Sequence, residues 1–483
     1  MTSLPEPGLW SRRGVLGVAA AVGGGLAVPP LAGAATIGIA LSEPLPDPVG
    51  RGVQVWDVSP LDYVAEEYLM RGTAPIFQSV TMADAIDMSK RDNVADLGRR
   101  SFPPREVLSV APYCTRVVVY RPRDMSRFSG VALIEPFHPA GGGNLIVWPL
   151  VNRFLSLRGH VLIAVQHPIT FDGVRKADPA RYGALNAAHP TQLWGMLADT
   201  ARLAKGFSHG RPIPAAARRL FMTGYSYTGV ATATFANFHH HDSRAPDGAP
   251  LFDGYVPMAN ATYVRPLDVP VIRFNTQSDF NSFGGLANRL PDSDAPDSRR
   301  RLYEAAGAAH AGAHDPVPGS ARPPVEHKVE QAEHLPQSHD SVCRAAFPQG
   351  AQDNNLPTRP FMEGIFDNLI AWIDHGTPPP HAPLIATDAD GNAALDADGN
   401  AIGGLRMADM QAPVATYGLG TGDCLLLGYR LPFTSERRQA LYGDRDAYLG
   451  RYDAAVDALV ADRWIPADSA AWLREHGRRD AQF

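Results

Sequence analysis

The sequence predicts an α/β protein with a mostly parallel central sheet flanked by helices. Short apolar runs such as 161–165 (VLIAV) lack the polar alternation of a strand with one wet face, so both faces of the sheet should be buried. From about residue 115 to residue 310 these runs alternate with helical patterns, as expected for parallel strands joined by crossover helices. Hydrophobic residues make up 45% and charged residues 19% of the 483 residues, which is enough apolar material for a large core.

The expected elements follow one another in a regular order. We expect strands at 107–123, 130–134, 161–165, 219–223, 254–258, 269–274 and 302–306. We expect helices at 147–157, 191–205, 228–238, 359–375 and from about 438 onward. Residues 312–358 are rich in proline, histidine and polar side chains, and we expect a surface insertion there that supplies loop and helical cap segments.

The charge balance argues against a nucleic-acid partner. The chain has 44 Lys and Arg against 50 Asp and Glu, which gives a net charge of −6 rather than the basic excess of a phosphate-binding surface. Beyond the N-terminus no run of about 18 apolar residues occurs, so we expect no membrane span in the processed protein.

Residues 1–34 read as a twin-arginine signal peptide. Arg12 and Arg13 precede an apolar stretch, and Ala32-Gly33-Ala34 supplies small residues for cleavage. The alternative is a membrane anchor, but glycines and prolines interrupt the short apolar run. We expect a periplasmic or extracellular protein whose residues 35–483 form one domain with an N-terminal extension.

The three cysteines, Cys114, Cys343 and Cys424, lack the spacing of a metal site. They allow at most one internal disulfide, and the sequence leaves the pairing open. We expect neither a metal nor a cofactor.

The segment Gly224-Tyr225-Ser226-Tyr227-Thr228-Gly229 lies between an expected strand and an alanine-rich helix. A serine on a sharp strand-to-helix turn needs small neighbours, and the usual pattern is Gly-x-Ser-x-Gly. Here Thr228 replaces the second glycine and Gly229 follows it. The alternative is an ordinary tight turn with a helix-capping serine. We expect Ser226 to be a nucleophile.

A serine nucleophile needs a base and an orienting acid, which in this arrangement follow in the order acid, then histidine. Asp279 comes just after the strand at 269–274, and His310 comes just after the strand at 302–306. Both positions lie at carboxyl ends of strands, where open α/β sheets bind ligands. The nearest rival base is His314, and His327, His334 and His339 lie further along the chain.

The oxyanion formed during acyl transfer needs N–H donors. We expect one from the backbone of Tyr227. We expect the second from the loop that begins with Phe137 and His138 and continues into Gly141-Gly142-Gly143. A phosphate cradle is the alternative for this glycine loop, but no Lys-Ser or Lys-Thr follows it.

Two weaker patterns favour structural interpretations. Residues 388–392 and 396–400 resemble calcium loops without the closing glutamate. Their Asp-Gly and Gly-Asn pairs are turn signals, so we favour a β-hairpin. The run of histidines at 239–241 ends a helix and is expected to cap it rather than bind metal.

The chain resembles the alpha/beta hydrolase domain family of exported bacterial hydrolases, whose elbow usually reads Gly-x-Ser-Gln-Ser. The resemblance extends over YVAEEYLMRGTA (63–74), TRVVVYRPRD (115–124), DPARYGALN (178–186), GYSYTG (224–229), the QSD ending at Asp279, YEAAGAAH (303–310) and AWIDHGTPPP (371–380). Tyr227 and Thr228 replace the usual Gln and Ser. The resemblance implies an α/β-hydrolase fold and a serine hydrolase with Ser226, Asp279 and His310 as its triad.

We therefore expect hydrolysis of a small-molecule carboxylic ester through an acyl-enzyme. An amidase or lactonase on the same triad is an alternative, because this fold hosts several chemistries. A binding protein on a hydrolase scaffold is another, and the complete set of three residues argues against it.

Overall fold

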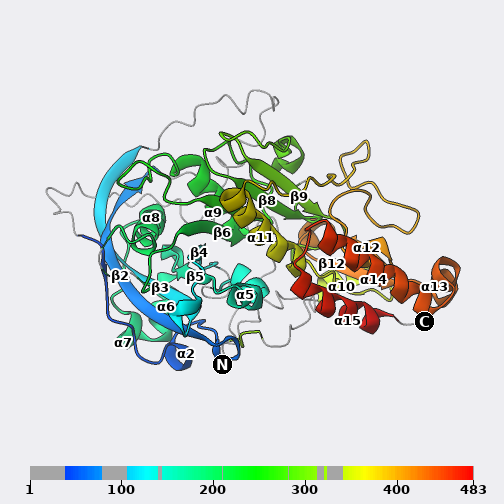
Figure 1. The fold of residues 1–483 in the computed structure, drawn as a ribbon, viewed down its shortest axis with the longest axis horizontal. Helices are drawn as coiled ribbons and strands as arrows, with labels where there is room; N and C mark the ends of the chain where they lie inside the picture. The colour runs from blue at the N-terminus through cyan, green and yellow to red at the C-terminus, as the bar shows by residue number, and fades with distance from the viewer. Residues whose placement is uncertain are drawn as a thin grey trace, which may run out of the picture.

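A nine-stranded sheet runs through the part of the chain that the structure describes, with the strand order β1-β2-β3-β5-β4-β6-β7-β8-β9 (Figure 1). The computed structural model describes residues 38–78, 106–139, 144–208, 210, 212–280, 282–312, 320–323 and 341–481. The strands are β1 Ala40–Leu41, β2 Tyr63–Phe77, β3 Val107–Pro122, β4 Val131–Pro136, β5 Val161–Val165, β6 Arg219–Tyr225, β7 Gly254–Met258, β8 Val271–Thr276 and β9 Arg300–Ala305. Strands β4 to β9 pair in parallel and β1 to β3 pair antiparallel, which confirms the mostly parallel sheet.

Helices cover both faces of this sheet. The α-helices are α2 Pro48–Arg51, α5 Val147–Leu157, α6 Phe171–Ala177, α7 Pro179–Tyr182, α8 Leu193–Ala204, α9 Tyr227–Phe238, α10 Ser341–Ala346, α11 Arg359–His375, α12 Ala408–Gln411, α13 Ser435–Tyr442, α14 Arg445–Ala461 and α15 Ala470–Asp480. One core joins α5 and α11 to the sheet, and a second core joins α6, α8 and α9 to its other face. In β3, Val118 belongs to the first core and Val117 and Val119 belong to the second. Burial on both faces explains why the strands are apolar throughout.

Strands β2 and β3 form a long bent pair at one edge of the sheet (Figure 1). The segment 63–74 lies in β2, where Glu67 is fully buried. Its carboxylate forms ion pairs with Arg116 and Arg181 and accepts a hydrogen bond of 2.7 Å from the Tyr182 hydroxyl. The two arginines hold the pKa of Glu67 below its usual value against the effect of burial. The DPARYG segment thus anchors the start of the sheet.

The C-terminal part packs beside the β9 edge (Figure 1). It contains a small sheet of β10 Gln352–Asp353, β12 Gly428–Pro432 and β11 Ala415–Leu419, for which we expected no strands from the sequence. A disulfide joins Cys343 to Cys424, whereas Cys114 is buried and free. The sequence allowed one disulfide, and the structure supplies its pairing.

The two aspartate-rich repeats form turns. One antiparallel bridge closes each repeat: Thr387 pairs with Ala393 around the first, and Leu395 pairs with Ala401 around the second. The Oδ1 atom of Asp388 accepts hydrogen bonds from the backbone of Asp390 and Asn392 at 3.0 and 2.9 Å. The antiparallel bridges and these backbone contacts of Asp388 agree with the expected β-hairpin.

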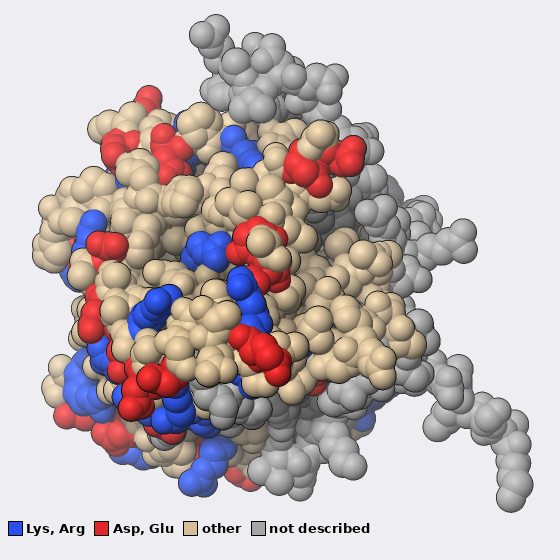
Figure 2. All heavy atoms as spheres, turned by 90° about the vertical axis from the view of Figure 1, so that its right-hand side faces the viewer, with Lys and Arg blue, Asp and Glu red and all other residues tan. Residues whose placement is uncertain are grey.

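Charged side chains are interspersed on the face that carries the C-terminal helices (Figure 2). Many of them pair, as Arg437 does with Asp398 and Arg474 with Asp457. No helix within the described ranges is both long and apolar enough to cross a lipid bilayer. The predicted signal peptide at 1–34 lies outside the described residues.

Candidate active site

The predicted nucleophile lies on a strained turn between β6 and α9. Ser226 has φ 57° and ψ −122°, a conformation that non-glycine residues rarely adopt. Its backbone N–H donates to the carbonyl oxygen of Met258 at 3.1 Å, and its own carbonyl accepts from Val230 at 2.9 Å. A strained serine held between a strand and a helix is the geometry of a nucleophile elbow.

Close packing explains which positions in the turn must be glycine. A Cβ atom on Gly224 would lie 2.2 Å from the carbonyl oxygen of Thr228, and one on Gly229 would lie 2.2 Å from that of Met258. Thr228 itself is accommodated because its hydroxyl folds back onto Tyr225, accepting from its N–H and donating to its carbonyl, each at 2.9 Å. The close-packed glycine here is therefore Gly229, one residue later than in the usual pattern.

Asp279 and His310 meet at the carboxyl ends of β8 and β9. The Nδ1 atom of His310 lies 2.7 Å from Oδ1 of Asp279, and both side chains are buried. The Oδ2 atom of Asp279 accepts from the Thr276 hydroxyl at 2.6 Å and from the Thr276 N–H at 3.2 Å. These bonds orient the carboxylate toward the imidazole.

The three residues Gln277, Ser278 and Asp279 all bind the loop that carries His310. Gln277 accepts a hydrogen bond from the Gly307 N–H at 2.6 Å, and the Ser278 hydroxyl accepts one from the His310 N–H at 3.1 Å. The QSD segment therefore fixes both the backbone and the ring of His310.

Tyr225 joins the histidine loop to the elbow. Its hydroxyl donates to the His310 carbonyl at 2.7 Å, and its ring centroid lies 5.2 Å from the imidazole. Because Tyr225 directly precedes Ser226, the structure brings His310 to the elbow. The rival bases His314, His327, His334 and His339 lie outside the described residues.

The C-terminal part supports the histidine loop from the other side. The Ala311 N–H donates to the Leu426 carbonyl at 2.9 Å, and the Asn354 side chain donates to the Gly307 carbonyl at 2.8 Å. Leu426 follows Cys424 by two residues, so the disulfide lies next to this support.

Two of the three backbone N–H groups expected to bind the oxyanion have other hydrogen-bond partners. Tyr227 is the first residue of α9, so its N–H has no acceptor within the helix. The N–H of Phe137, however, donates to the Val165 carbonyl at 2.9 Å, and that of His138 donates to the Asn144 carbonyl at 2.6 Å. Neither N–H is available to an oxyanion, so the prediction for these two residues is corrected. The glycines 141–143 lie outside the described residues.

A buried carboxylate holds both ends of the loop after β4. Glu135 accepts hydrogen bonds from the N–H groups of Ile146, Val147 and Trp148 at 2.8, 2.8 and 3.0 Å. Burial raises its pKa to about 7, and the three N–H groups oppose that rise. Since Glu135 precedes Phe137 by two residues, it fixes the loop to the first turn of α5.

Two clusters have donor atoms close enough for a metal ion among the described residues, and neither uses a triad residue. One consists of His240, His241 and Asp268, but Arg244 pairs with Asp268 at 2.8 Å. The other consists of Asp409, His476 and Asp480, and Arg430 lies 3.3 Å from Asp480. A guanidinium already neutralises a carboxylate in each cluster, so structural ion pairing accounts for both.

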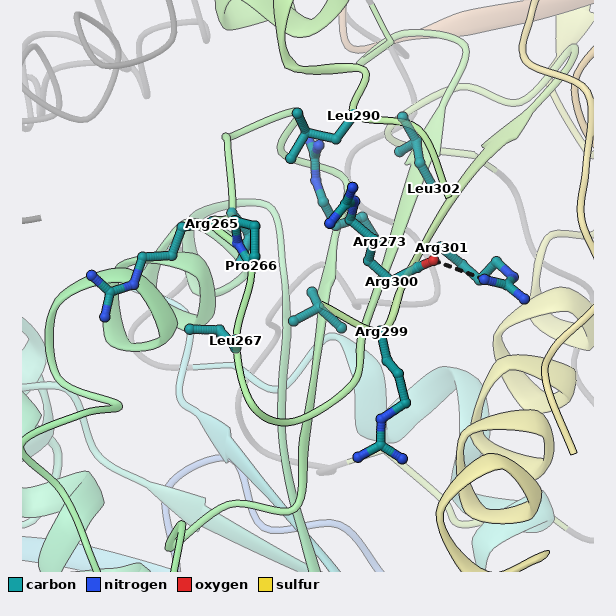
Figure 3. A pocket seen from close by; sticks show the side chains of 11 residues that line it. Arg265, Pro266, Leu267, Arg273, Leu290, Arg299, Arg300, Arg301 and Leu302 are labelled. Atoms are coloured by element: carbon teal, nitrogen blue, oxygen red, sulfur yellow. Dashed lines mark hydrogen bonds between the residues drawn. The ribbon is translucent and has the colours of Figure 1, made fainter. Parts of the chain in front are cut away.

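A small pocket, partly open to solvent, lies at the amino ends of β8 and β9, away from the triad. Several arginines line it, but Arg265, Arg299 and Arg301 point in different directions (Figure 3). Arg301 donates to the Pro379 carbonyl at 3.0 Å and packs on Trp372. Because these guanidinium groups do not converge, they do not form a single anion site.

Solved structures with low similarity to the chain include serine hydrolases and an esterase. No curated protein matches the chain. An α/β serine hydrolase homologue from Coxiella burnetii is 13% identical with a TM-score of 0.27, and covers 41% of this chain and 84% of its own. An α/β serine hydrolase without a lid from Xanthomonas campestris is 14% identical with a TM-score of 0.25, and covers 40% and 78%. An esterase from Pyrobaculum calidifontis is 14% identical with a TM-score of 0.26, and covers 46% and 78%.

The family comparison covers nearly the whole chain. The family described as "Alpha/beta hydrolase domain" matches residues 28–474, which include all the strands and the three predicted triad residues. On this match, the protein belongs to the alpha/beta hydrolase domain family.

Proposed function

We propose that this protein is a serine hydrolase that cleaves a carboxylic ester through Ser226, His310 and Asp279. The observation that carries the proposal is the His310–Asp279 pair at 2.7 Å, attached through Tyr225 to the strained turn that carries Ser226. A serine, an imidazole and a buried carboxylate in this order are the parts that acyl transfer needs.

The reaction proceeds in two stages. In the first stage the free ring nitrogen of His310 takes the proton of Ser226, whose oxygen attacks the ester carbonyl. The Tyr227 N–H stabilises the oxyanion, and His310 returns the proton to the leaving alcohol. In the second stage His310 takes a proton from water, which attacks the acyl-enzyme, and returns that proton to the Ser226 oxygen as the acid is released. Asp279 holds the imidazole orientation and stabilises its charged form.

We also propose that the protein acts outside the cytoplasm. The twin-arginine pattern at Arg12 and Arg13 supports export, and the Cys343–Cys424 disulfide suits an oxidising compartment. Replacing both arginines by lysine should retain the precursor in the cytoplasm. Equal secretion of that variant would contradict export by this route.

A serine-directed fluorophosphonate and 4-nitrophenyl butanoate test the activity together. Wild-type protein should be labelled and hydrolytic, whereas Ser226→Ala should lose labelling and about 10⁴-fold or more of kcat while keeping its melting temperature. Ser293→Ala is the matched control, because Ser293 bridges Arg300 at the amino end of β9, the end opposite to His310. This variant should behave as wild type. Substantial labelling or hydrolysis by Ser226→Ala would overturn the proposal.

A further inference from the structure

The side chain of Tyr227 lies against two buried histidines. Its ring centroid is 6.0 Å from that of His138 and 5.6 Å from that of His167, both in edge-on geometry. His138 follows β4 and His167 follows β5, so these rings come from the carboxyl ends of two adjacent strands. They lie beside the nucleophile because Tyr227 is the next residue after Ser226.

Hydrogen bonding fixes the tautomer of His167. Its Nδ1 atom accepts the Ile169 N–H at 3.2 Å, at the start of a short 3-10 turn, so the proton of the neutral ring is on Nε2. Within the described residues, neither this Nε2–H nor the Tyr227 hydroxyl has a hydrogen-bond partner. Tyr227 is half-buried and His167 is 4% exposed, and neither donor atom belongs to the fully buried side-chain atoms that lack a partner. Both donors are therefore open to an acceptor on a ligand.

The surroundings of these donors are uncharged. Burial lowers the pKa of His167 and of His138 to about 3, so both rings are neutral at physiological pH. Burial is the cause that shifts the pKa of His167 and of Tyr227, and no charged side chain in the described part of the chain adds to either shift. A neutral acceptor fits such donors better than an ionised group, which would be left without a counter-charge.

The sheet order shows which part of a substrate would lie here. Strand β6 carries the elbow, with β4 and β5 on one side and β8 and β9 on the other. His310 must reach the leaving-group oxygen to protonate it, so the leaving group belongs on the β8–β9 side. The acyl group then extends over β4 and β5, toward Tyr227 and His167.

We propose that the Nε2–H of His167, together with the Tyr227 hydroxyl, binds an uncharged oxygen in the acyl chain of the ester. This inference rests on the proposed function and assigns the acyl class: esters whose acid carries an ether, keto or hydroxyl oxygen near the carbonyl. His167 is a specificity-determining residue in this assignment. The inference also gives a role to Tyr227, which replaces the usual Gln after the elbow serine.

Two pairs of near-isosteric substrates isolate the contribution of that oxygen. The 4-nitrophenyl esters of methoxyacetate and butanoate differ by one oxygen in place of one methylene group, as do those of 3-methoxypropanoate and pentanoate. For each pair, the kcat/KM of the oxygen-containing ester divided by that of the alkyl ester gives a ratio. Comparing this ratio between variants and wild type cancels the intrinsic reactivity of the esters.

His167→Asn removes the Nε2–H donor but leaves an amide oxygen that can accept the Ile169 N–H. It should lower the ratio about tenfold for at least one pair, as expected for the loss of one hydrogen bond. His189→Asn is the matched control, because its Nδ1 caps a similar turn by accepting the Thr191 N–H at 3.3 Å. That control should keep the wild-type ratio.

Tyr227→Phe provides an independent variant that retains the ring and the backbone N–H. It should also lower the ratio, by severalfold. Wild-type ratios for both pairs in His167→Asn and in Tyr227→Phe would overturn the inference. Loss of Ser226-dependent labelling in the wild type would instead refute the proposed function, so the two failures are distinguishable.

Discussion

The imidazole of His310 and the carboxylate of Asp279 form a buried pair, 2.7 Å apart, although 31 residues separate them in the chain. Three further hydrogen bonds hold this pair in place, two from Thr276 to Asp279 and one from His310 to Ser278. The pair is thus built into the ends of two adjacent strands, β8 and β9, and does not depend on a flexible surface segment.

Replacing Asp279 by Asn should lower kcat about 10⁴-fold, because the amide favours the wrong imidazole tautomer. The fold should persist, since the amide keeps the size of the carboxylate. Steady-state hydrolysis of a 4-nitrophenyl ester measures the effect. Asp268→Asn is the matched control, because Asp268 pairs with His240 outside the site. An active Asp279→Asn enzyme would mean that another group orients His310.

Gly229→Ala should lower both stability and activity. The new methyl group would lie 2.2 Å from the Met258 carbonyl oxygen, which also accepts the Ser226 N–H, so the elbow must shift. Gly173→Ala is a matched helix control. A Cβ atom there meets nothing within 4 Å and should stabilise the protein by up to about 1 kcal/mol. Melting temperatures and ester hydrolysis compare the two variants, and a fully active Gly229→Ala protein would contradict the packing argument.

Replacing Cys343 and Cys424 by Ser should lower the free energy of unfolding by about 2–5 kcal/mol, because the disulfide closes a loop between residues 81 apart in sequence. Activity should fall too, since the segment after Cys424 supports Ala311, next to His310. Guanidinium unfolding with and without dithiothreitol measures the stability change. Cys114→Ala should leave the sensitivity to reductant as in the wild type, and a wild type insensitive to reductant would argue against the pairing.

His160 should make the protein sensitive to acid. Burial is the main cause that lowers its pKa from 6.5 to about 3, with Arg158 and Arg218 adding to the shift. Between pH 7 and pH 5 the unfolded chain binds a proton on this ring and the folded chain does not. Stability from this group is therefore present above pH 6.5 and falls by about 2 kcal/mol by pH 5.

The variant His160→Asn isolates this contribution, because an amide can keep the 2.7 Å contact to the Ser129 hydroxyl without titrating. Its free energy of unfolding should decrease less than that of the wild type when the pH is lowered from 7 to 5. Denaturant unfolding at both pH values provides the comparison. Parallel decreases in the two proteins would show that His160 is protonated in the folded state.

The sequence determined the elements and the elbow because both depend on neighbours along the chain. The apolar runs predicted the parallel strands, and the expected strand ends placed Asp279 and His310 at one edge of the sheet. The glycines at 224 and 229 marked a turn that only small residues permit. These signals are local, so composition and spacing were sufficient to predict the structure there.

Only the tertiary structure decided features whose partners come from distant segments. Phe137 and His138 looked like oxyanion donors in sequence, but Val165 and Asn144 accept their N–H groups. The pairing of Cys343 with Cys424 likewise depends on how the C-terminal part packs. His167 gave no signal in sequence, because its place beside Tyr227 follows from the adjacency of β5, β4 and β6 in the sheet. Sequence spacing predicts which groups leave a strand end, but hydrogen-bond partners across the sheet determine which of them remain available for chemistry.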